Sequence, residues 1–314
     1  MECHYRNPLS NMPYLNNMWR VIALINAGVI ISSFSVGQVK KQFSIEENAR
    51  FEKMDMKFAT KSGVCFIKPS QHNVPLSIYS NQDFDDYEHT FNKKITNNIC
   101  FVDLSLKDKN SDNLSKSISY QMFSNSDKKI EKSWKIYLSQ STPYRLDLNY
   151  GMGDAYIDLS GLSIENLKVN SGNADVNIGF MSELGNQIEM DTFFVKVDLG
   201  SVNVKQMALT NARTVMADIG FGNMFLDYSD QSTGGCNINA SVGAGNLIVI
   251  IPTNNVPVKV KINDSMLCRV RLTKSFREIE NNTFVNHSYT SDTKDVLAFD
   301  VDVSLGTIVF KEIK

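Results

Sequence analysis

Aspartates in the second half of the chain are the residues best suited to acid–base chemistry. Six of them fall on segments that read as successive β-strands: Asp154, Asp158, Asp175, Asp198, Asp218 and Asp227. Cleavage of a glycosidic bond needs two carboxyl groups in one cleft, one of them with a raised pKa. A pair on adjacent strands could supply this in a glycan-active β-helix enzyme. However, outward carboxylates are also what any water-exposed strand array needs, so we expect structural aspartates and no catalytic residues.

Metal ligands are not suggested by the remaining titratable residues. The four histidines, His4, His72, His89 and His287, are widely spaced, and no pair has the HxxxH spacing of a zinc site. An acidic cluster at Asp83, Asp85, Asp86 and Glu88 lacks the regular spacing and glycine of a calcium-binding EF-hand, and is better read as a solvated loop. The sequence Gly151-Met152-Gly153-Asp154 does not reproduce the GGxGxDx repeat of calcium-binding β-rolls. We therefore predict no metal and no cofactor.

Nucleophilic and phosphate-binding motifs are also lacking. The chain has no GxSxG elbow, and Gly243-Ala244-Gly245 lies between two expected strands instead of ahead of a helix. Trp134 and Tyr137 could stack on a sugar, but aromatic residues at strand positions more often belong to the core. The sequence predicts a protein that is not an enzyme.

Cysteine usage and charge limit the partners further. Cys3 lies in a leader, and the other four cysteines allow three disulfide pairings or none, because buried free thiols fit the same strand positions. The four are Cys65, Cys100, Cys236 and Cys268. No CxxC motif is present. The formal net charge is only −2, so no global field would attract nucleic acid, and we predict no nucleic-acid partner.

A secretory signal peptide is predicted near the start of the chain. Arg20 precedes the apolar run 21–31, and Ser35 and Gly37 place small residues before a cut ahead of Gln38. The alternative is an N-terminal membrane anchor, but the apolar run is shorter than the roughly 20 residues that span a bilayer. We therefore expect residues 1–37 to be leader and signal peptide. The mature protein would be exported, to the periplasm or the cell surface, with no stable membrane span after cleavage.

Glycine turns recur through the second half of the chain. Six segments repeat a strand, a glycine and a second strand, and the glycines expected to form these structural turns are Gly153, Gly172, Gly200, Gly222, Gly245 and Gly306. Spacings of 19 to 28 residues between the first five are close to one solenoid turn. Glycine adopts positive φ at little cost, and the short polar residue after it can bond turn amides.

Alternating apolar residues after each turn are expected to face a common core. They are Ala155, Ile157 and Leu159; Ala174, Val176 and Ile178; Val202 and Val204; Met224, Leu226 and Tyr228; Leu247, Val249 and Ile251; Ile308 and Phe310. Since successive strand residues point to opposite sides, the residues between them face outward. No single turn can bury such a face alone, so neighbouring turns must stack.

The strand that contains Ile248 and Ile250 is apolar on both faces. A strand of this kind is usually buried on both sides, so something should cover it. We expect the insertion at residues 252–298 to do so, with a binding face as the alternative. The predicted organisation is a leader at 1–37, a β-rich region at 38–142 and a β-solenoid at 143–314 that carries this insertion.

The repeat resembles the toast-rack domains of bacterial envelope proteins, which include LiaF-like envelope-response proteins and proposed adhesins. The resemblance rests on the segments 151–162, 243–252 and 299–309 and covers roughly Tyr144 to Lys314, with weaker similarity before it. It implies an all-β, β-helix-like solenoid at the cell envelope, with a role in envelope sensing or adhesion and no agreed catalytic residues. The chain lacks the several membrane-spanning helices of the LiaF pattern.

These observations predict a non-catalytic, exported envelope or cell-surface protein that acts as an adhesin-like binding or scaffold module. Its partner would be a protein or glycan at the cell envelope, or another copy of the chain through self-association. Two alternatives remain, a glycan-active β-helix enzyme that uses paired aspartates and an envelope-stress regulator.

Overall fold

The computed structural model describes residues 40–46, 50–81, 87–108, 132–229, 235–253 and 256–312. The predicted leader and signal peptide, and Asp83, Asp85 and Asp86 of the acidic cluster, lie outside these residues. The described residues form one compact unit. Among the described residues, no helix is long and apolar enough to cross a bilayer.

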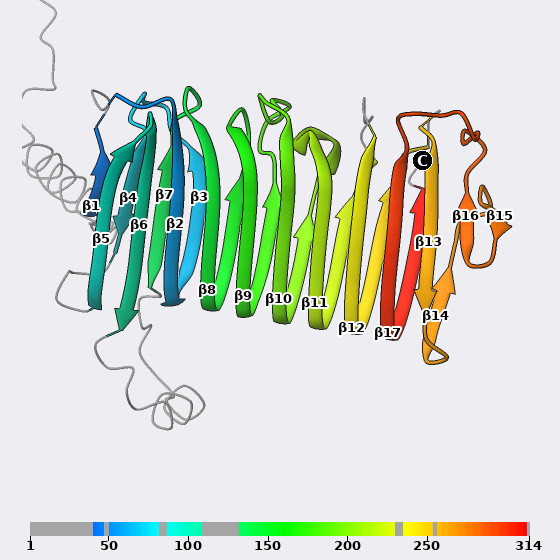
Figure 1. The fold of residues 1–314 in the computed structure, drawn as a ribbon. Coiled ribbons are helices and arrows are strands. Elements are labelled where there is room, and N and C mark those ends of the chain that lie inside the picture. The colour runs from blue at the N-terminus through cyan, green and yellow to red at the C-terminus, as the bar shows by residue number, and fades with distance from the viewer. Residues whose placement is uncertain are drawn as a thin grey trace, which may run out of the picture. The chain divides into compact units, whose positions relative to one another are not determined.

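Strands make up most of the described chain (Figure 1). In the first half they are β1 (Lys40–Ile45), β2 (Lys53–Ser62), β3 (Val64–Pro69), β4 (Leu76–Ser80), β5 (Tyr87–Thr96), β6 (Ile99–Asp108) and β7 (Ser133–Leu138). The long strands are β8 (Pro143–Asp158), β9 (Ser163–Gly179), β10 (Met190–Val204), β11 (Ala212–Asp227), β12 (Cys236–Ile251) and β17 (Leu297–Glu312). Between the last two lie β13 (Val258–Asp264), β14 (Cys268–Arg271), β15 (Arg277–Glu280) and β16 (Thr283–Val285). A short 3₁₀ helix, η2 (Met207–Thr210), follows β10. The prediction of an all-β solenoid is confirmed.

Each long strand bends in its middle and forms two arms. In β10 the buried side chains fall on odd positions from Phe193 to Val197 and on even positions from Val202 onward. Because this switch occurs at the bend, both arms direct their apolar side chains into the same core. We call each bent strand a rung and the row of bends the arch edge, which runs along the lower side of Figure 1.

The stacked rungs form two sheets around one core. Along the first sheet, which contains the arms before the bend, the order is β5, β6, β2, β8, β9, β10, β11, β12, β17 and β13. The second sheet contains the arms after the bend, with β1, β4, β7 and β3 before β8 and with β14 after β17. The rungs pair in parallel, as expected of a solenoid, and antiparallel strands occur only towards the ends of the sheets.

The stack extends beyond the six rungs expected from the sequence. Strands β2 and β3 form a further rung that bends at Gly63 and pairs with both arms of β8. Strands β6 and β7 pair with β2 and β3 in the same way. At the other end, β13 and β14 of the insertion pair with the two arms of β17, so β17 lies between β12 and a rung that precedes it in sequence. The domain boundary at residue 143 stays a prediction, although strands from both sides of it share the same sheets.

The predicted inward residues all lie in the core, and so does Trp134, which contacts Phe58 edge to face with ring centroids 6.5 Å apart. Cys65, Cys100 and Cys236 are buried free thiols. On the strand with two apolar faces, Ile250 is fully buried and Ile248 is half-buried. Cover of these two residues by the insertion stays a prediction.

The turn glycines occupy two columns at the arch edge. Gly153, Gly200, Gly222, Gly245 and Gly306 share one register position and all have positive φ. The position in β9 that pairs with Gly153 and Gly200 is occupied by Ala174. Gly172 lies two residues earlier, at the position of Gly151, where an added Cβ would stand 2.8 Å from the carbonyl oxygen of Gly151. Gly172 therefore lies within the bend of β9, between the buried residues Ser171 and Ala174, but without the positive φ of the other five glycines.

Candidate binding surface

The outer face of the first sheet carries polar side chains that contact one another from rung to rung. Asn170 Nδ2 donates to Asn149 Oδ1 at 3.1 Å, and the Lys168 ammonium lies 3.6 Å from Asp147. Further along the sheet, Lys196 Nζ lies 3.7 Å from Asp218. Parallel in-register stacking places such side chains about 4.8 Å apart, which is close enough for these contacts. The result is a polar surface built on a rigid array.

Glu165 links three rungs on this face. It is the extra residue at a register shift between β8 and β9, and it accepts hydrogen bonds from Lys53 Nζ at 3.1 Å and from Arg145 Nε at 2.6 Å. Partial burial raises its pKa, but the hydrogen bonds from Lys53 and Arg145 and their positive charges outweigh burial, so its pKa is lowered. The ionised carboxylate therefore stabilises the fold.

We expect the substitution Glu165→Gln to lower the free energy of unfolding at pH 7 by up to about 1 kcal/mol, because the ion pairs are part-exposed. A lowered folded-state pKa gives stabilisation that is present above the unfolded pKa and lost as pH falls through the folded value. The difference between variant and parent should thus shrink below about pH 4 in thermal melts. Glu189→Gln is the control, since Glu189 pairs with Arg213 at 2.5 Å but is 56% exposed. An equal loss in both variants would contradict a special role for Glu165.

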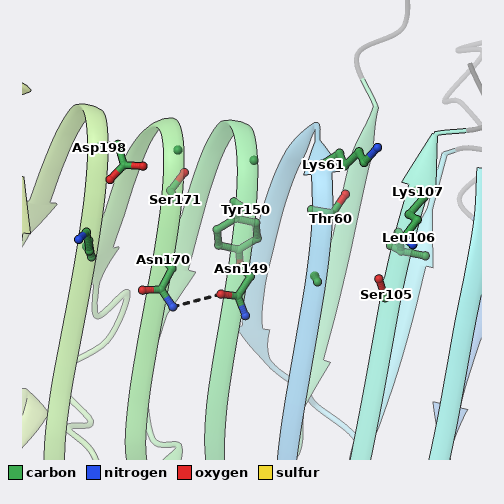
Figure 2. A pocket seen from close by; sticks show the side chains of 14 residues that line it. Thr60, Lys61, Ser105, Leu106, Lys107, Asn149, Tyr150, Asn170, Ser171 and Asp198 are labelled. Carbon is green, nitrogen blue, oxygen red and sulfur yellow. Dashed lines mark hydrogen bonds between the residues drawn. The ribbon is translucent and has the colours of Figure 1, made fainter. Parts of the chain in front are cut away.

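A hollow of about 540 Å³ lies on this face near the arch edge (Figure 2). It spans the arms of β6, β2, β8, β9 and β10. Small residues line it at two register positions: Ser105 and Ala59 lie beside Asn149 and Asn170, and Gly151 and Gly172 lie between Lys61 and Asp198. The polar floor between them is formed by Asn149 and Asn170, which Figure 2 shows joined by their hydrogen bond.

Positively charged side chains outnumber negatively charged ones around the hollow. Lys61 and Lys107 lie at one end, and Lys196 and Asp198 lie at the other. Among the residues that line the hollow, three are lysines and one is acidic. Amide groups bind hydroxyl groups, and ammonium groups bind carboxylate or phosphate. The hollow therefore suits a polar ligand that bears negative charge.

Sequence reasoning did not identify these lining residues. The available signal was the run of small side chains at outward positions, in particular Ala59, Gly151 and Gly172. That signal becomes visible only once the register between the first-half rung β2–β3 and β8 is known.

The six aspartates do not gather in the hollow, where only Asp198 is present. Asp158 accepts hydrogen bonds from the Ser160 and Met181 amides at 3.0 and 3.1 Å, and Asp227 accepts one from the Ser229 amide at 2.9 Å. Asp218 pairs with Lys196. These three aspartates thus hold turns or ion pairs, as expected of structural residues.

Asp154 and Asp175 are the aspartates that the register brings side by side, on the second sheet just after the bend. Ser201 Oγ donates to Asp175 Oδ1 at 2.5 Å. Neither residue lines the described hollow. The two-carboxylate cleft that glycosidic cleavage needs is not formed there.

Two buried thiols have environments unsuited to nucleophilic attack. Burial raises the pKa of Cys65 to about 12, although a contact with the Tyr150 hydroxyl partly offsets this. Burial likewise raises the pKa of Cys236 to about 12, with a smaller opposing effect of Tyr228. Because the thiolate is the reactive form, both side chains stay inert at neutral pH. Within the described part of the chain, no group of three His, Cys, Asp or Glu residues is arranged to hold a metal ion.

Comparison with known proteins identifies the fold family. Residues 35–205 match the family described as the N-terminal domain of toast_rack, DUF2154. The chain belongs to the toast-rack family. This match starts well before Tyr144, so the toast-rack region includes the rungs formed by β2, β3, β6 and β7, which the resemblance had placed outside its main segment.

Three solved structures found by comparison share little sequence with this toast-rack chain. A proposed cell adhesion protein from Clostridium sporogenes has 15% identity and a TM-score of 0.42, covering 88% of this chain and 100% of its own. A proposed adhesin from Bacteroides fragilis has 13% identity and a TM-score of 0.34, covering 87% and 96%. A proposed lipid-binding protein from Parabacteroides distasonis has 11% identity and a TM-score of 0.28, covering 88% and 96%. No curated protein matches the sequence.

Proposed function

We propose that the chain is a non-catalytic binding protein of the cell envelope that presents the outer face of its first sheet to an acidic glycan. The hollow between Lys61, Lys107 and Lys196 is the observation that carries this proposal. Its amides match sugar hydroxyls, and its excess of ammonium groups matches carboxylate or phosphate substituents. Export through cleavage before Gln38 and a final location in the periplasm or on the cell surface are parts of the same proposal.

A scaffold with stacked rungs is well suited to this role. Each rung repeats the same backbone at a fixed spacing, so ligand groups on the outer face would be held by side chains that stand in rows. A glycan is itself a repeating chain, and it could contact several rungs in succession. A protein partner is the other outcome that binding experiments would reveal.

The lysines at the first end of the hollow provide the test. We expect Lys61→Ser combined with Lys107→Ser to weaken binding of polygalacturonate, an acidic polysaccharide probe, by about tenfold, because two charge-assisted contacts are lost. Isothermal titration or surface plasmon resonance would measure the change.

The matched control replaces two exposed lysines elsewhere, Lys205→Ser with Lys311→Ser, where Lys311 lies on the second sheet. These changes remove the same total charge and should leave affinity within about twofold. Equal weakening in both double variants would indicate only a general charge effect. Absence of binding by the parent chain would contradict the proposal for acidic glycans. Export is tested separately, by mass spectrometry of the N-terminus after expression in a bacterial host.

A further inference from the structure

Large apolar side chains are exposed in a row along the arch edge. They occupy the register position just before the bend glycine: Met152, Leu199, Phe221 and Leu305, with exposures of 47%, 50%, 63% and 51%. Asn173 and Ala244 fill the same position in β9 and β12. In the terminal rung, Leu267 and Met266 continue the row at the connection from β13 to β14, with exposures of 71% and 104%. We call this row the apolar ridge.

The ridge does not serve the packing of the described residues. The ridge side chains are exposed, whereas the nearest core side chains before and after a bend, such as Val197 and Val202, are buried. Folding alone does not require large apolar residues there, since Asn173 and Ala244 are tolerated at the same position. A line of exposed large apolar side chains, here interrupted at Asn173 and Ala244, is typical of an interaction surface.

Acidic residues are missing beside the C-terminal half of the ridge. From β11 to β14, the positions before the ridge are occupied by Gly220, Gly243, Ser304 and Ser265, and those after the bend glycines by Asn223, Asn246, Thr307 and Arg269. These flanks are neutral or positive, in a chain whose formal net charge is −2. An occupant that excludes carboxylates would favour this arrangement in the C-terminal half, whereas Asp154 and Asp198 flank Met152 and Leu199 in the other half.

The dimensions of the ridge argue against a second copy as the occupant. Its width is set by the distance of about 10 Å between the sheets, and its seven rungs at about 4.8 Å give a length of about 29 Å. The available area is therefore about 300 Å², whereas a stable dimer needs about 800 Å² from each partner. A lipid bilayer has no such minimum, because apolar side chains enter the interfacial region to a depth of about 5–10 Å and each one contributes separately.

We propose that the apolar ridge, in particular Met266 and Leu267, inserts into the interfacial region of a lipid bilayer. The solenoid is thereby bound to the membrane with its arch edge facing the bilayer. This assignment is independent of the proposed glycan contact, because the hollow lies on the face of the first sheet and the ridge on its edge. Both could be occupied together. Since the attraction is apolar, it should persist at high salt.

Tryptophan at position 266 provides a local measurement. In the full-length chain, Met266→Trp is compared with Met181→Trp, which replaces an equally apolar residue of 84% exposure in the connection between β9 and β10, away from the arch edge. With phosphatidylcholine vesicles that contain brominated acyl chains, we expect emission at 266 to be quenched about threefold more than emission at 181. A leader that binds vesicles by itself would not create this difference between the two positions.

Truncation of the ridge supplies the second measurement. Phe221→Ser with Leu305→Ser should weaken vesicle partitioning about tenfold, while Met181→Ser with Leu184→Ser should change it less than about twofold. Equal quenching at positions 266 and 181 would overturn the proposal. Vesicle partitioning that is the same in the ridge variants as in the parent chain would also overturn it. Concentration-dependent self-association that the ridge variants abolish, without lipid quenching, would overturn it in favour of a second copy. The glycan measurement with the lysine variants can fail or succeed separately.

Discussion

Replacing Gly245 by alanine is expected to destabilise the solenoid by about 3 kcal/mol or more, one of the two largest single-residue effects that we predict. Gly245 has φ of +143°, a conformation that is essentially restricted to glycine. A Cβ at this position would also collide with the carbonyl oxygen of Gly222 on the adjacent rung. Backbone atoms cannot move aside as a flexible side chain can, so both rungs would have to separate at the bend. Thermal or urea denaturation followed by circular dichroism would measure the loss.

Gly179→Ala is the matched control for this substitution. Gly179 lies in a strand of the same stack without positive φ, and an added Cβ would make only ordinary contact, 3.5 Å from Cβ of Lys205. The change should alter stability by less than about 1 kcal/mol and could raise it, because alanine restricts the unfolded chain. If Gly245→Ala proved as mild as Gly179→Ala, the bend would not depend on the glycine conformation.

The glycine spacing predicted the solenoid because the constraint at each bend is local. Positive φ and close backbone approach must be satisfied within a few residues, so Gly153, Gly200, Gly222, Gly245 and Gly306 mark the bends directly in the sequence. Side-chain alternation after each bend is equally local, and it identified the inward residues. Gly172 shows the limit of this reasoning, because it lacks the positive φ of these five glycines, and Ala174 occupies the register position of Gly153 and Gly200 in β9.

Rungs formed by separate strands could not be recognised from spacing. Gly63 joins β2 to β3, but the next rung along the first sheet uses β6 and β7, which are more than 20 residues apart in sequence. Strands β13 and β14 precede β17 in the chain and yet stack beyond it. Such order depends on which edges remain unpaired when the other strands have assembled. The hollow and the apolar ridge combine side chains from several rungs, so their recognition required the register.

Asn186 illustrates a stabilising residue that sequence reasoning missed. It lies in the connection between β9 and β10 and is 8% exposed. Its Nδ2 donates to the carbonyl oxygens of Ile164 and Ile188, both at 2.8 Å, and its Oδ1 accepts from the Ile164 amide at 2.7 Å. Asn286 binds Val258 and Val256 in a similar way at the far end of the stack. An isolated asparagine in a polar loop offers no pattern from which this could be read.

We expect Asn186→Ala to lower the free energy of unfolding by about 3 kcal/mol, because one amide and two carbonyl groups would lose their partner in a buried site. Gln187→Ala is the control: the neighbouring side chain makes one exposed hydrogen bond, to the Gly185 carbonyl at 2.7 Å, and its loss should cost less than about 1 kcal/mol. Hydrogen exchange would show where the structure is destabilised, since the Ile164 amide should lose protection in Asn186→Ala and keep it in Gln187→Ala. Retained protection of that amide in Asn186→Ala would mean that water replaces the side chain, and the expected loss of stability should then be smaller.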